Sequence, residues 1–335
     1  MRVSEPRPRD PVVTAAADEA YALPLAVVMG SALDHLDPAR RLRIHVLDAG
    51  LEPTTRARLE AAWRSRGASV VWIEPDIVSL EGLPVGGHIS LATYFRILLP
   101  RVLPETLDRT LYLDCDTLVL GDLARLWDEP QGDAPALGVQ DPAYPYLDAA
   151  RVLPREDPRG SHAAKPIENY EALGLDPALP YVNCGVLVVD LARWRAEDLP
   201  KQILECLERN RPFVRFWDQY GINAVLAGRI RMVDHRWNVS VYLGDGGAWE
   251  HSLFRPEEFA EIVREPWVVH FLGPNKPWQW GSRLRYADRY RDAMQRIPWT
   301  AGERRRYTLA SRRLRERRRL AKSLRRLRKR FRSGS

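Results

Sequence analysis

The chain has 335 residues, 45% of them hydrophobic, and it can therefore bury one large core or two smaller ones. Its net charge of +7 is uneven, because residues 303–332 carry +14, from fourteen arginines, two lysines and two glutamates, while the remainder carries −7. No apolar run reaches the ~20 residues of a membrane-spanning helix, and the widely spaced Cys115, Cys184 and Cys206 fit small core residues rather than a disulfide framework or a zinc site.

The first part of the chain alternates strand-like and helix-like segments. Residues 22–33 are the most apolar stretch, but they follow Asp18 and Glu19, whereas a signal peptide needs a basic flank, so we expect a cytoplasmic protein. The alternation is typical of an α/β fold with a largely parallel sheet. Strands are expected at residues 12–17, 42–50, 68–74 and 111–120, and helices at 19–33, 53–66 and 90–100.

A second set of elements continues this pattern. Residues 141–180 are rich in Pro, Gly, Asp and Tyr and predict a long loop, a kind of segment that is often functional. Strands are expected at residues 136–140, 181–191, 230–234 and 266–271, and helices at 191–209 and 217–227.

Two aspartates interrupt the apolar run LYLDCDTLVL at residues 111–120. Residues i and i+2 of a strand point to the same side, so Asp114 and Asp116 can converge. At the carboxyl end of a parallel strand they would lie where open α/β sheets bind ligands, and their oxygens suit Mg²⁺ or Mn²⁺. The alternative is that the strand ends at Leu113 and both acids are solvated turn residues; the tripeptide alone favours neither.

A strand followed by D-x-D also begins the haloacid-dehalogenase-like phosphatases, which use the first Asp as nucleophile and the second as acid. Their motif usually continues D-x-D-x-[TV] and lies near the start of the chain. Here Leu118 stands at the fifth position and Thr117 one place too early, so this class is disfavoured.

The segments around the motif decide the question. Residues 110–128, TLYLDCDTLVLGDLARLWD, resemble the D-x-D segment of the family 8 glycosyltransferases, retaining enzymes that use nucleotide-sugar donors. The similarity covers most of residues 11–282 and is closest to the bacterial lipopolysaccharide enzymes. The other matching stretches occur in the family's order: VVTAAADEAYALPLAVVMGS, LRIHVLDAGL and HISLATYFRILLP before the motif, and YVNCGVLVVDLARWR, WDQYGINAVL and VVHFLGPNKPW after it.

The resemblance implies a nucleotide-sugar-binding fold, a GT-A-like, Rossmann-type α/β/α sandwich with a mostly parallel central sheet. It implies transfer of galactose or glucose from a UDP-sugar to a glycan or lipid-linked glycan acceptor at the inner face of the cell membrane. We accordingly expect a catalytic domain at residues 11–282, between a flexible N-terminus at 1–10 and a connecting helix or linker at 283–302, followed by a basic tail at 303–335.

The family's metal ligands match Asp114, Asp116 and His270, which implies Mn²⁺, with Mg²⁺ as the second candidate. An imidazole beside two carboxylates suits Mn²⁺ better than Ca²⁺, although His270 alone would more often be a structural histidine. Lys276 resembles the family's diphosphate-binding lysine, and Gly273 would let the backbone approach the phosphates closely.

The loop after the first expected strand resembles the family's uracil-binding loop. Ala16 and Asp18 match residues that contact the base, and Tyr21 matches one that stacks on it. Ala20 stands where the family often has Asn, so one hydrogen bond that the resemblance implies to the nucleotide is not expected here. Arg96 matches a basic residue that reaches the donor sugar and the diphosphate.

Further matches surround the expected position of the sugar. Asn183 matches a residue at the donor sugar, and Asp141 matches one that touches the sugar or the acceptor. Asp114 and Cys115 are also expected beside the nucleotide sugar. His88 matches a position on the acceptor side.

Asp218 and Gln219 match an Asp–Gln pair beside the reacting carbon. Asp218 would hold sugar hydroxyls, and Gln219 occupies the place of a double-displacement nucleophile. Because an amide oxygen is a poor nucleophile, a front-face mechanism stays open beside it. The alternative to an enzyme is a non-catalytic nucleotide-sugar-fold protein that docks through its basic tail, but the complete set of metal ligands favours the enzyme.

The basic segment 303–332 predicts an amphipathic helix, because Leu320, Leu324, Leu327 and Phe331 are spaced 4, 3 and 4 residues apart. Such a helix can lie on an anionic membrane surface. Nucleic-acid binding and a solvated extension are the alternatives. We favour the membrane surface, since related bacterial enzymes modify lipid-linked glycans.

Overall fold

The computed structural model describes residues 10–83, 91–152, 165–243 and 253–309. The expected N-terminal segment 1–10, apart from its last residue, and the tail from residue 310 onward lie outside these ranges, as does His88. No helix among the described residues is both long and apolar enough to cross a membrane.

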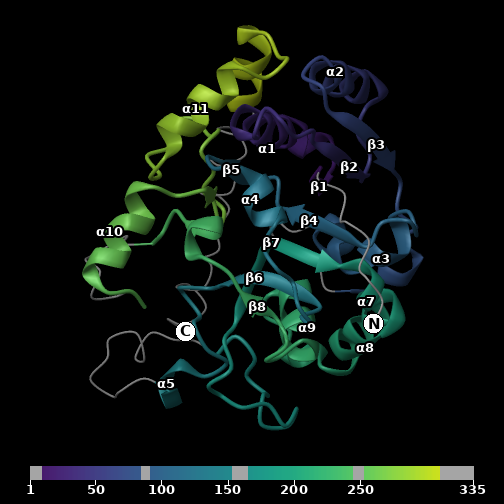
Figure 1. The fold of residues 1–335 in the computed structure, drawn as a ribbon, viewed down its shortest axis with the longest axis vertical. Helices are drawn as coiled ribbons and strands as arrows, with labels where there is room; N and C mark the ends of the chain where they lie inside the picture. Colours follow the sequence, from purple (N-terminus) through teal and green to yellow (C-terminus); the bar gives the residue numbers. More distant parts are fainter. Residues whose placement is uncertain (1–9, 84–90, 153–164, 244–252, 310–335) are drawn as a thin grey trace, which may run out of the picture.

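A seven-stranded sheet, in the order β3-β2-β1-β4-β7-β6-β8, forms the centre of the molecule (Figure 1). All of its neighbouring pairs are parallel except those of β7, which runs antiparallel to β4 and β6. The expectation of a mostly parallel sheet is thereby confirmed. The strands are β1 (Val12–Ala17), β2 (Arg43–Asp48), β3 (Ser69–Ile73), β4 (Arg109–Leu113), β6 (Ala136–Gln140), β7 (Val182–Asp190) and β8 (Arg231–Met232).

Helices cover both faces of this sheet and complete an α/β/α sandwich (Figure 1). One layer holds α1 (Ala22–His35), α2 (Pro53–Arg64) and α11 (Ala287–Gln295). The other holds the 3₁₀ helix η3 (Leu91–Leu98), α3 (Leu99–Val102), α7 (Leu191–Ala196), α8 (Leu199–Arg209) and α9 (Trp217–Val225). Shorter or peripheral elements are η1 (Glu19–Tyr21), η2 (Val78–Leu80), α4 (Leu123–Trp127), α5 (Ala149–Val152), η4 (Arg211–Phe213), η5 (His235–Asn238) and α10 (Pro256–Arg264).

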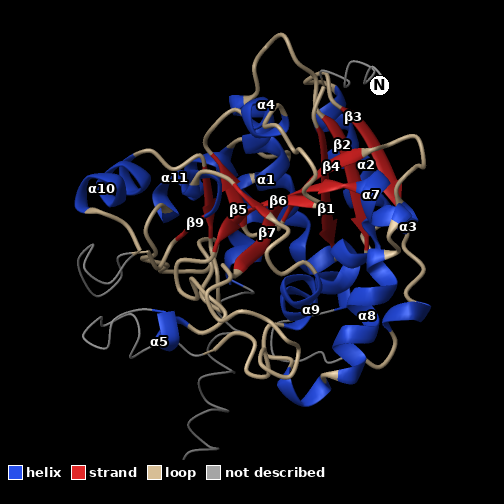
Figure 2. Cartoon of the chain, turned by 60° about the horizontal axis from the view of Figure 1, so that its bottom comes forward, coloured by secondary structure: helices blue, strands red, loops and turns tan. Residues whose placement is uncertain are grey.

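A second, three-stranded sheet lies beside the first (Figure 2). Its central strand β10 (Val268–His270) pairs antiparallel with β5 (Thr117–Val119) and parallel with β9 (Val239–Ser240). The single strand expected over residues 111–120 is therefore wrong, because the chain leaves the large sheet after Leu113 and enters the small one at Thr117.

Hydrogen bonds of the Asp114 main chain explain the turn between the two sheets. The Asp114 backbone N–H still donates to the oxygen of Gly185 in β7 (2.8 Å), but its own carbonyl accepts from both the N–H and the hydroxyl of Thr117. This closes a tight turn at residues 114–116. The helix expected over 191–209 is likewise two helices, which meet at Asp198, a residue with left-handed backbone (φ 44°).

Helices α8 and α9 pack so closely that the contact requires a glycine. A Cβ added at Gly221 of α9 would lie 2.9 Å from Cγ2 of Ile203 and 2.9 Å from Cγ of Leu207, both in α8. Gly30 of α1 offers a contrast, since no atom lies within 4 Å of a Cβ added there. The close contact matters for the cavity described below, because α9 carries Asp218 and Gln219.

We predict opposite effects of two Gly→Ala substitutions. Gly221→Ala should destabilise the fold by about 1–3 kcal/mol through overpacking, which exceeds the gain in helix propensity. Gly30→Ala should stabilise it by up to about 1 kcal/mol, because only the propensity changes. Urea denaturation of both variants measures the difference. Equal midpoints would contradict the close α8–α9 contact.

Candidate active site

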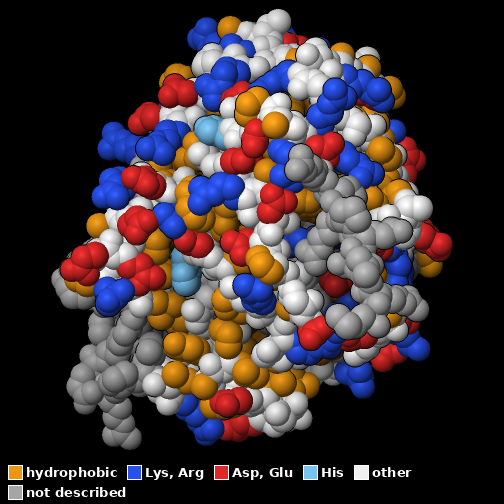
Figure 3. Space-filling model, in the orientation of Figure 1, with side chains coloured by type: hydrophobic (Ala, Val, Ile, Leu, Met, Phe, Trp, Pro, Cys, Tyr) orange, Lys and Arg blue, Asp and Glu red, His pale blue; other side chains and the backbone are white. Residues whose placement is uncertain are grey.

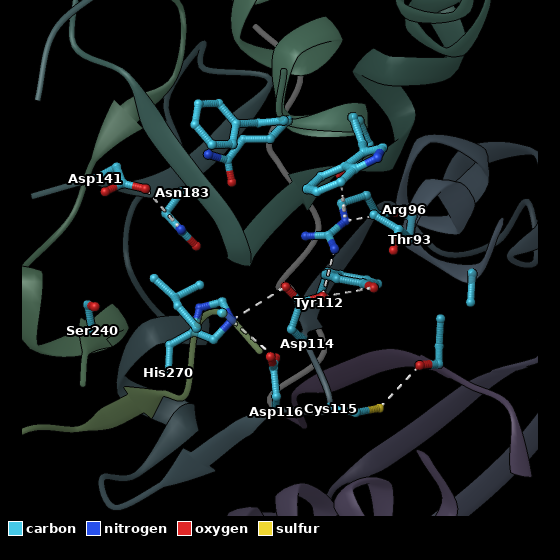
Figure 4. A pocket seen from close by; sticks show the side chains of 18 of the residues that line it. Thr93, Arg96, Tyr112, Asp114, Cys115, Asp116, Asp141, Asn183, Ser240 and His270 are labelled. Atoms are coloured by element: carbon cyan, nitrogen blue, oxygen red, sulfur yellow. Dashed lines mark hydrogen bonds and ion pairs between the residues drawn. The ribbon is translucent and has the colours of Figure 1, made fainter. Parts of the chain in front are cut away.

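A cavity of about 540 Å³ opens at the carboxyl ends of β1 and β4, where the two sheets meet (Figure 4). The expected site residues in the described part of the chain come from distant segments, yet all of them line this one cavity. They are Ala16, Asp18, Tyr21, Arg96, Asp114, Cys115, Asp116, Asp141, Asn183, Asp218, Gln219, His270, Gly273 and Lys276. His88, the expected acceptor-side residue, lies outside the described residues.

The two turn carboxylates lie against the nitrogen atoms of basic side chains rather than against solvent. Asp116 Oδ1 lies 3.1 Å from His270 Nε2, and Asp116 Oδ2 lies 2.5 Å from Lys276 Nζ. Asp114 Oδ2 lies 3.7 Å from the same His270 nitrogen. The acids are turn residues, but their side chains are only 22% and 16% exposed, so the alternative of two solvated acids is wrong.

The charge around Asp116 shows why two acids can be buried here. Burial alone would raise the pKa of the Asp116 carboxyl, but Lys276 and His270 hold that pKa well below its usual value. Lys276 is itself almost fully buried, and its ammonium group also donates to the backbone oxygen of Phe271 (2.8 Å). The carboxylate therefore stays ionised inside the cavity.

Asn238 orients the buried imidazole of His270. Its side-chain Nδ2 donates to Asn183 Oδ1 (3.0 Å), so its Oδ1 faces His270 Nδ1, also at 3.0 Å. A proton on Nδ1 leaves the lone pair of Nε2 pointing at Asp116 Oδ1. Two acceptors at that distance repel each other unless a proton or a metal cation lies between them.

The donor set fits a divalent cation. Ligand atoms of Asp114, Asp116 and His270 all lie within 4.8 Å of one another. The distances of 3.1 and 3.7 Å from Nε2 to the carboxylates resemble the ~3 Å between adjacent ligands of a six-coordinate ion with bonds of ~2.1 Å. The absence of a side chain at Gly185 leaves space for two of these ligands. A Cβ there would lie 2.6 Å from His270 Nδ1 and 2.9 Å from Asp114 Oδ2.

Arg96 is buried and contacts several groups at once, unlike most arginines on helices, which are solvated. Its guanidinium lies 2.7 Å from Asp114 Oδ1 and 2.8 Å from Asp218 Oδ2, donates to the Cys184 carbonyl, and stacks over Tyr112 with 4.7 Å to the ring centroid. Burial raises the pKa of Asp218 to about 7, and the charge of Asp114 adds to the rise while Arg96 opposes it. The pKa of Asp218 therefore lies near neutral pH, as is common for acids in functional sites.

On the opposite wall, polar side chains are fixed by one another. Gln219 Oε1 accepts from the Cys184 backbone N–H (3.1 Å), which orients its amide. Asn183 Nδ2 donates to Asp141 Oδ2 (3.1 Å), and burial raises the pKa of Asp141. Because Asn183 Oδ1 also accepts from Asn238, this wall is connected to His270 through Asn238.

The end of the cavity near β1 is lined by the expected nucleotide loop. Asp18 caps η1 by accepting from the Tyr21 N–H (3.1 Å), and the Tyr21 ring meets Trp278 edge-on at 6.0 Å. Cys115 Sγ donates to the Ala16 carbonyl, and burial raises the pKa of this thiol, so it is a neutral packing group. Gly273 has left-handed backbone (φ 73°), which a side chain would strain.

Two residues that shape the site without lining the cavity were not expected from the sequence. Asn238 and Gly185 act on His270 across the two sheets, and no local pattern distinguishes them. Aromatic side chains line the cavity itself: Tyr144, Phe216, Trp217 and Tyr242. Trp217 offered no signal either, although its left-handed backbone (φ 47°) is the kind of outlier that clusters at functional sites.

Known proteins resemble this chain in sequence. The model of glycosyl transferase family 8 matches residues 12–280. The general stress protein A of Bacillus subtilis is 26% identical over 290 residues, which span 86% of this chain and 94% of that protein. The lipopolysaccharide 1,3-galactosyltransferase of Salmonella typhimurium is 27% identical over 267 residues, 79% of this chain and 72% of that protein.

Among solved structures, the galactosyltransferase LgtC in complex with donor and acceptor sugar analogues is similar with a TM-score of 0.72 and 28% identity. The match covers 88% of this chain and 99% of that one. The sandwich with its cavity is therefore the GT-A-type fold of glycosyltransferases. Because the family match spans most of its length, this protein is a member of glycosyltransferase family 8.

Proposed function

We propose that this glycosyltransferase moves a hexose, galactose or glucose, from a UDP-sugar to a glycan or lipid-linked glycan, with retention of configuration and with Mn²⁺ as its metal. The convergence of Asp114, Asp116 and His270 beside Lys276 is the observation that supports this most strongly. The choice of sugars is supported by two relatives, a lipopolysaccharide 1,3-galactosyltransferase and a lipopolysaccharide 1,2-glucosyltransferase of Escherichia coli.

The diphosphate of the donor would lie between the metal ligands and Lys276. When bound, the metal supplies a Lewis acid that stabilises the negative charge growing on the leaving diphosphate. Lys276 holds a buried ammonium group 2.5 Å from Asp116. Because this cation is already in place, it would stabilise the negative charge on the leaving diphosphate in addition to the metal. Tyr21 offers an aromatic face to the base, and Gly273 lets the main chain come close to the phosphates.

The sugar would lie between Asp218, Asn183 and Asp141, whose oxygens can hold its hydroxyl groups and stabilise positive charge at the anomeric carbon. We favour a front-face displacement, in which the leaving phosphate accepts the acceptor's proton. The oxygen of Gln219 is a weak nucleophile and is already engaged by the Cys184 N–H. Both features disfavour a covalent glycosyl–Gln219 intermediate.

The acceptor would approach past the aromatic residues. Tyr144 and Phe216 pack with ring centroids 4.8 Å apart at the edge of the cavity. Aromatic faces suit the apolar faces of sugar rings, and Tyr144 belongs to the long segment 141–180. We therefore propose this wall as part of the acceptor groove.

The basic segment is proposed as a membrane anchor. On the face that Figure 3 shows, side chains of both signs are interspersed over α10 and α11, so no single-sign patch of the described body stands out there. The +14 of residues 303–332 is therefore the stronger candidate for contact with anionic lipid, at about 1 kcal/mol for each cation near the surface.

The donor and the metal are tested together. We expect release of UDP from UDP-galactose or UDP-glucose in the presence of Mn²⁺ and a galactoside or glucoside acceptor, and loss of that release on adding chelator. Asp116→Ala should abolish transfer while the variant stays folded, because it removes a metal ligand and the partner of Lys276. UDP release is measured by a coupled assay, and folding by circular dichroism.

Near wild-type turnover of Asp116→Ala with Mn²⁺ present would overturn the metal assignment. Tight binding of UDP by the wild-type protein without turnover of any donor would instead favour the non-catalytic binding protein.

Asn238 should set the metal affinity through His270. We expect Asn238→Ala to weaken Mn²⁺ binding about 10- to 100-fold, since the imidazole loses its orienting partner. Asn238→Asp keeps an acceptor for Nδ1 and should lose less. Free Mn²⁺ is measured by electron paramagnetic resonance. Unchanged affinity in a folded Asn238→Ala variant would show that other contacts orient His270.

The membrane proposal is tested by flotation with liposomes that contain anionic lipid. The full chain should float, and a chain that ends at Leu309 should stay at the bottom, because it keeps the packed residues 301–309 but lacks most of the basic segment. Added salt should release the full chain, since screening weakens the attraction. Equal flotation of both proteins would exclude the anchor.

A further inference from the structure

The described chain ends in a helical segment, residues 301–309, that lies beyond the part matched by the family. In Figure 1 this segment (yellow) lies at the same end of the molecule as α1 and α2. Its Tyr307 packs against the core, and the Tyr307 hydroxyl donates a hydrogen bond to the backbone oxygen of Ala20. Ala20 belongs to η1, the loop expected to hold the base of the nucleotide.

Side-chain contacts hold the start of the helical segment in place, N-terminal to Tyr307. Thr300 and Glu303 form a capping box: the Thr300 N–H donates to Glu303 Oε2 (2.7 Å), and the Glu303 N–H donates to Thr300 Oγ1 (3.2 Å). Glu303 also binds Arg58 of α2 (2.9 Å), whose guanidinium lies 5.4 Å from the Trp299 ring centroid. The start of the segment is thus tied to α2.

The nucleotide loop η1 is also bound to α2, through Glu19. Glu19 Oε2 accepts from the Glu52 backbone N–H (3.0 Å), and Glu19 Oε1 accepts from the Thr55 hydroxyl (2.9 Å). Both partners lie at the start of α2. The loop, α2 and the C-terminal segment therefore form a closed ring of contacts, in which the bond from Tyr307 to Ala20 is the last link.

The surroundings of Tyr307 keep it a hydrogen-bond donor. Burial raises the pKa of the Tyr307 hydroxyl, and the neighbouring Tyr21 and Asp18 raise it further. The hydroxyl is therefore neutral across the physiological range. Tyr21, the expected stacking residue, also contacts Trp278, ring edge against ring face.

We propose that Tyr307 is a positioning residue for the nucleotide loop, so that a segment outside the family-matched domain sets the affinity for the donor nucleotide. This rests on the proposed UDP-sugar donor. Ala20 has no polar side chain with which to fix the loop, so the main-chain bond to Tyr307 holds Asp18 and Tyr21 in place on either side of it. The basic segment 303–332 begins within this same helical segment.

The test compares two substitutions that each delete one phenol hydroxyl. Tyr307→Phe removes the bond to Ala20. Tyr286→Phe is the matched control, because the Tyr286 hydroxyl also donates to a main-chain oxygen, that of Val263 (2.6 Å), and neither residue lines the cavity. Both are made in the full-length chain.

The first readout needs no ligand. Hydrogen–deuterium exchange of the amides of residues 18–22 should become faster in Tyr307→Phe and stay unchanged in Tyr286→Phe. Unchanged exchange in Tyr307→Phe would overturn the proposal, whatever the protein binds.

The second readout is the Kd for UDP by calorimetry in saturating Mn²⁺. Loss of one neutral hydrogen bond should raise that Kd about three- to tenfold in Tyr307→Phe, with Mn²⁺ affinity and kcat near wild type and KM for the donor raised. An unchanged Kd would overturn the coupling to the nucleotide. Wild-type protein that binds no UDP, together with faster loop exchange in Tyr307→Phe, would refute the proposed donor and leave the positioning of the loop established.

Discussion

The site depends on keeping two carboxylates charged at a place where water is largely excluded. Asp114 and Asp116 lie in the turn that carries the chain from the large sheet to the small one, and each has a cationic partner, Arg96 on one side and Lys276 on the other. Without such partners, burial of a carboxylate would force it to take up a proton. The same positive groups that hold the acids are those that a diphosphate would need. One electrostatic arrangement would therefore serve both the fold and the binding of the proposed nucleotide-sugar donor.

The small sheet carries His270, the third ligand of the proposed metal site. His270 pairs with Thr117 in the antiparallel register of β10 and β5, and the next residue, Phe271, donates its N–H to the Asp116 carbonyl (2.9 Å). A slip of one residue in this register would turn His270 away from the cavity. The imidazole is then aimed by Asn238, which joins it to the wall that faces the expected sugar. The proposed metal and sugar positions are thus joined by one continuous hydrogen-bonded network.

Much of this could be predicted from the sequence, and the remainder could not, for a physical reason. The alternation of strands and helices follows from local patterns, whereas most residues of the cavity were predicted from the resemblance to the family 8 glycosyltransferases. The break at Leu113 does not, because an apolar run that contains two acids is consistent with one strand or with two. Asn238 and Gly185 were missed because they act through contacts between segments far apart in the chain. Tyr307 was missed because it lies in the basic segment 303–332, whose charge predicts a surface contact and not packing against the core.

The central claim is that Asp114, Asp116 and His270 bind one metal ion that holds the diphosphate of a nucleotide sugar. A crystal of the protein grown with Mn²⁺ and UDP, measured at the manganese absorption edge, tests it most directly. The account predicts one strong anomalous peak within coordination distance of all three side chains, with phosphate oxygens on its open side. A peak elsewhere, or UDP bound with no anomalous signal between these residues, would contradict it.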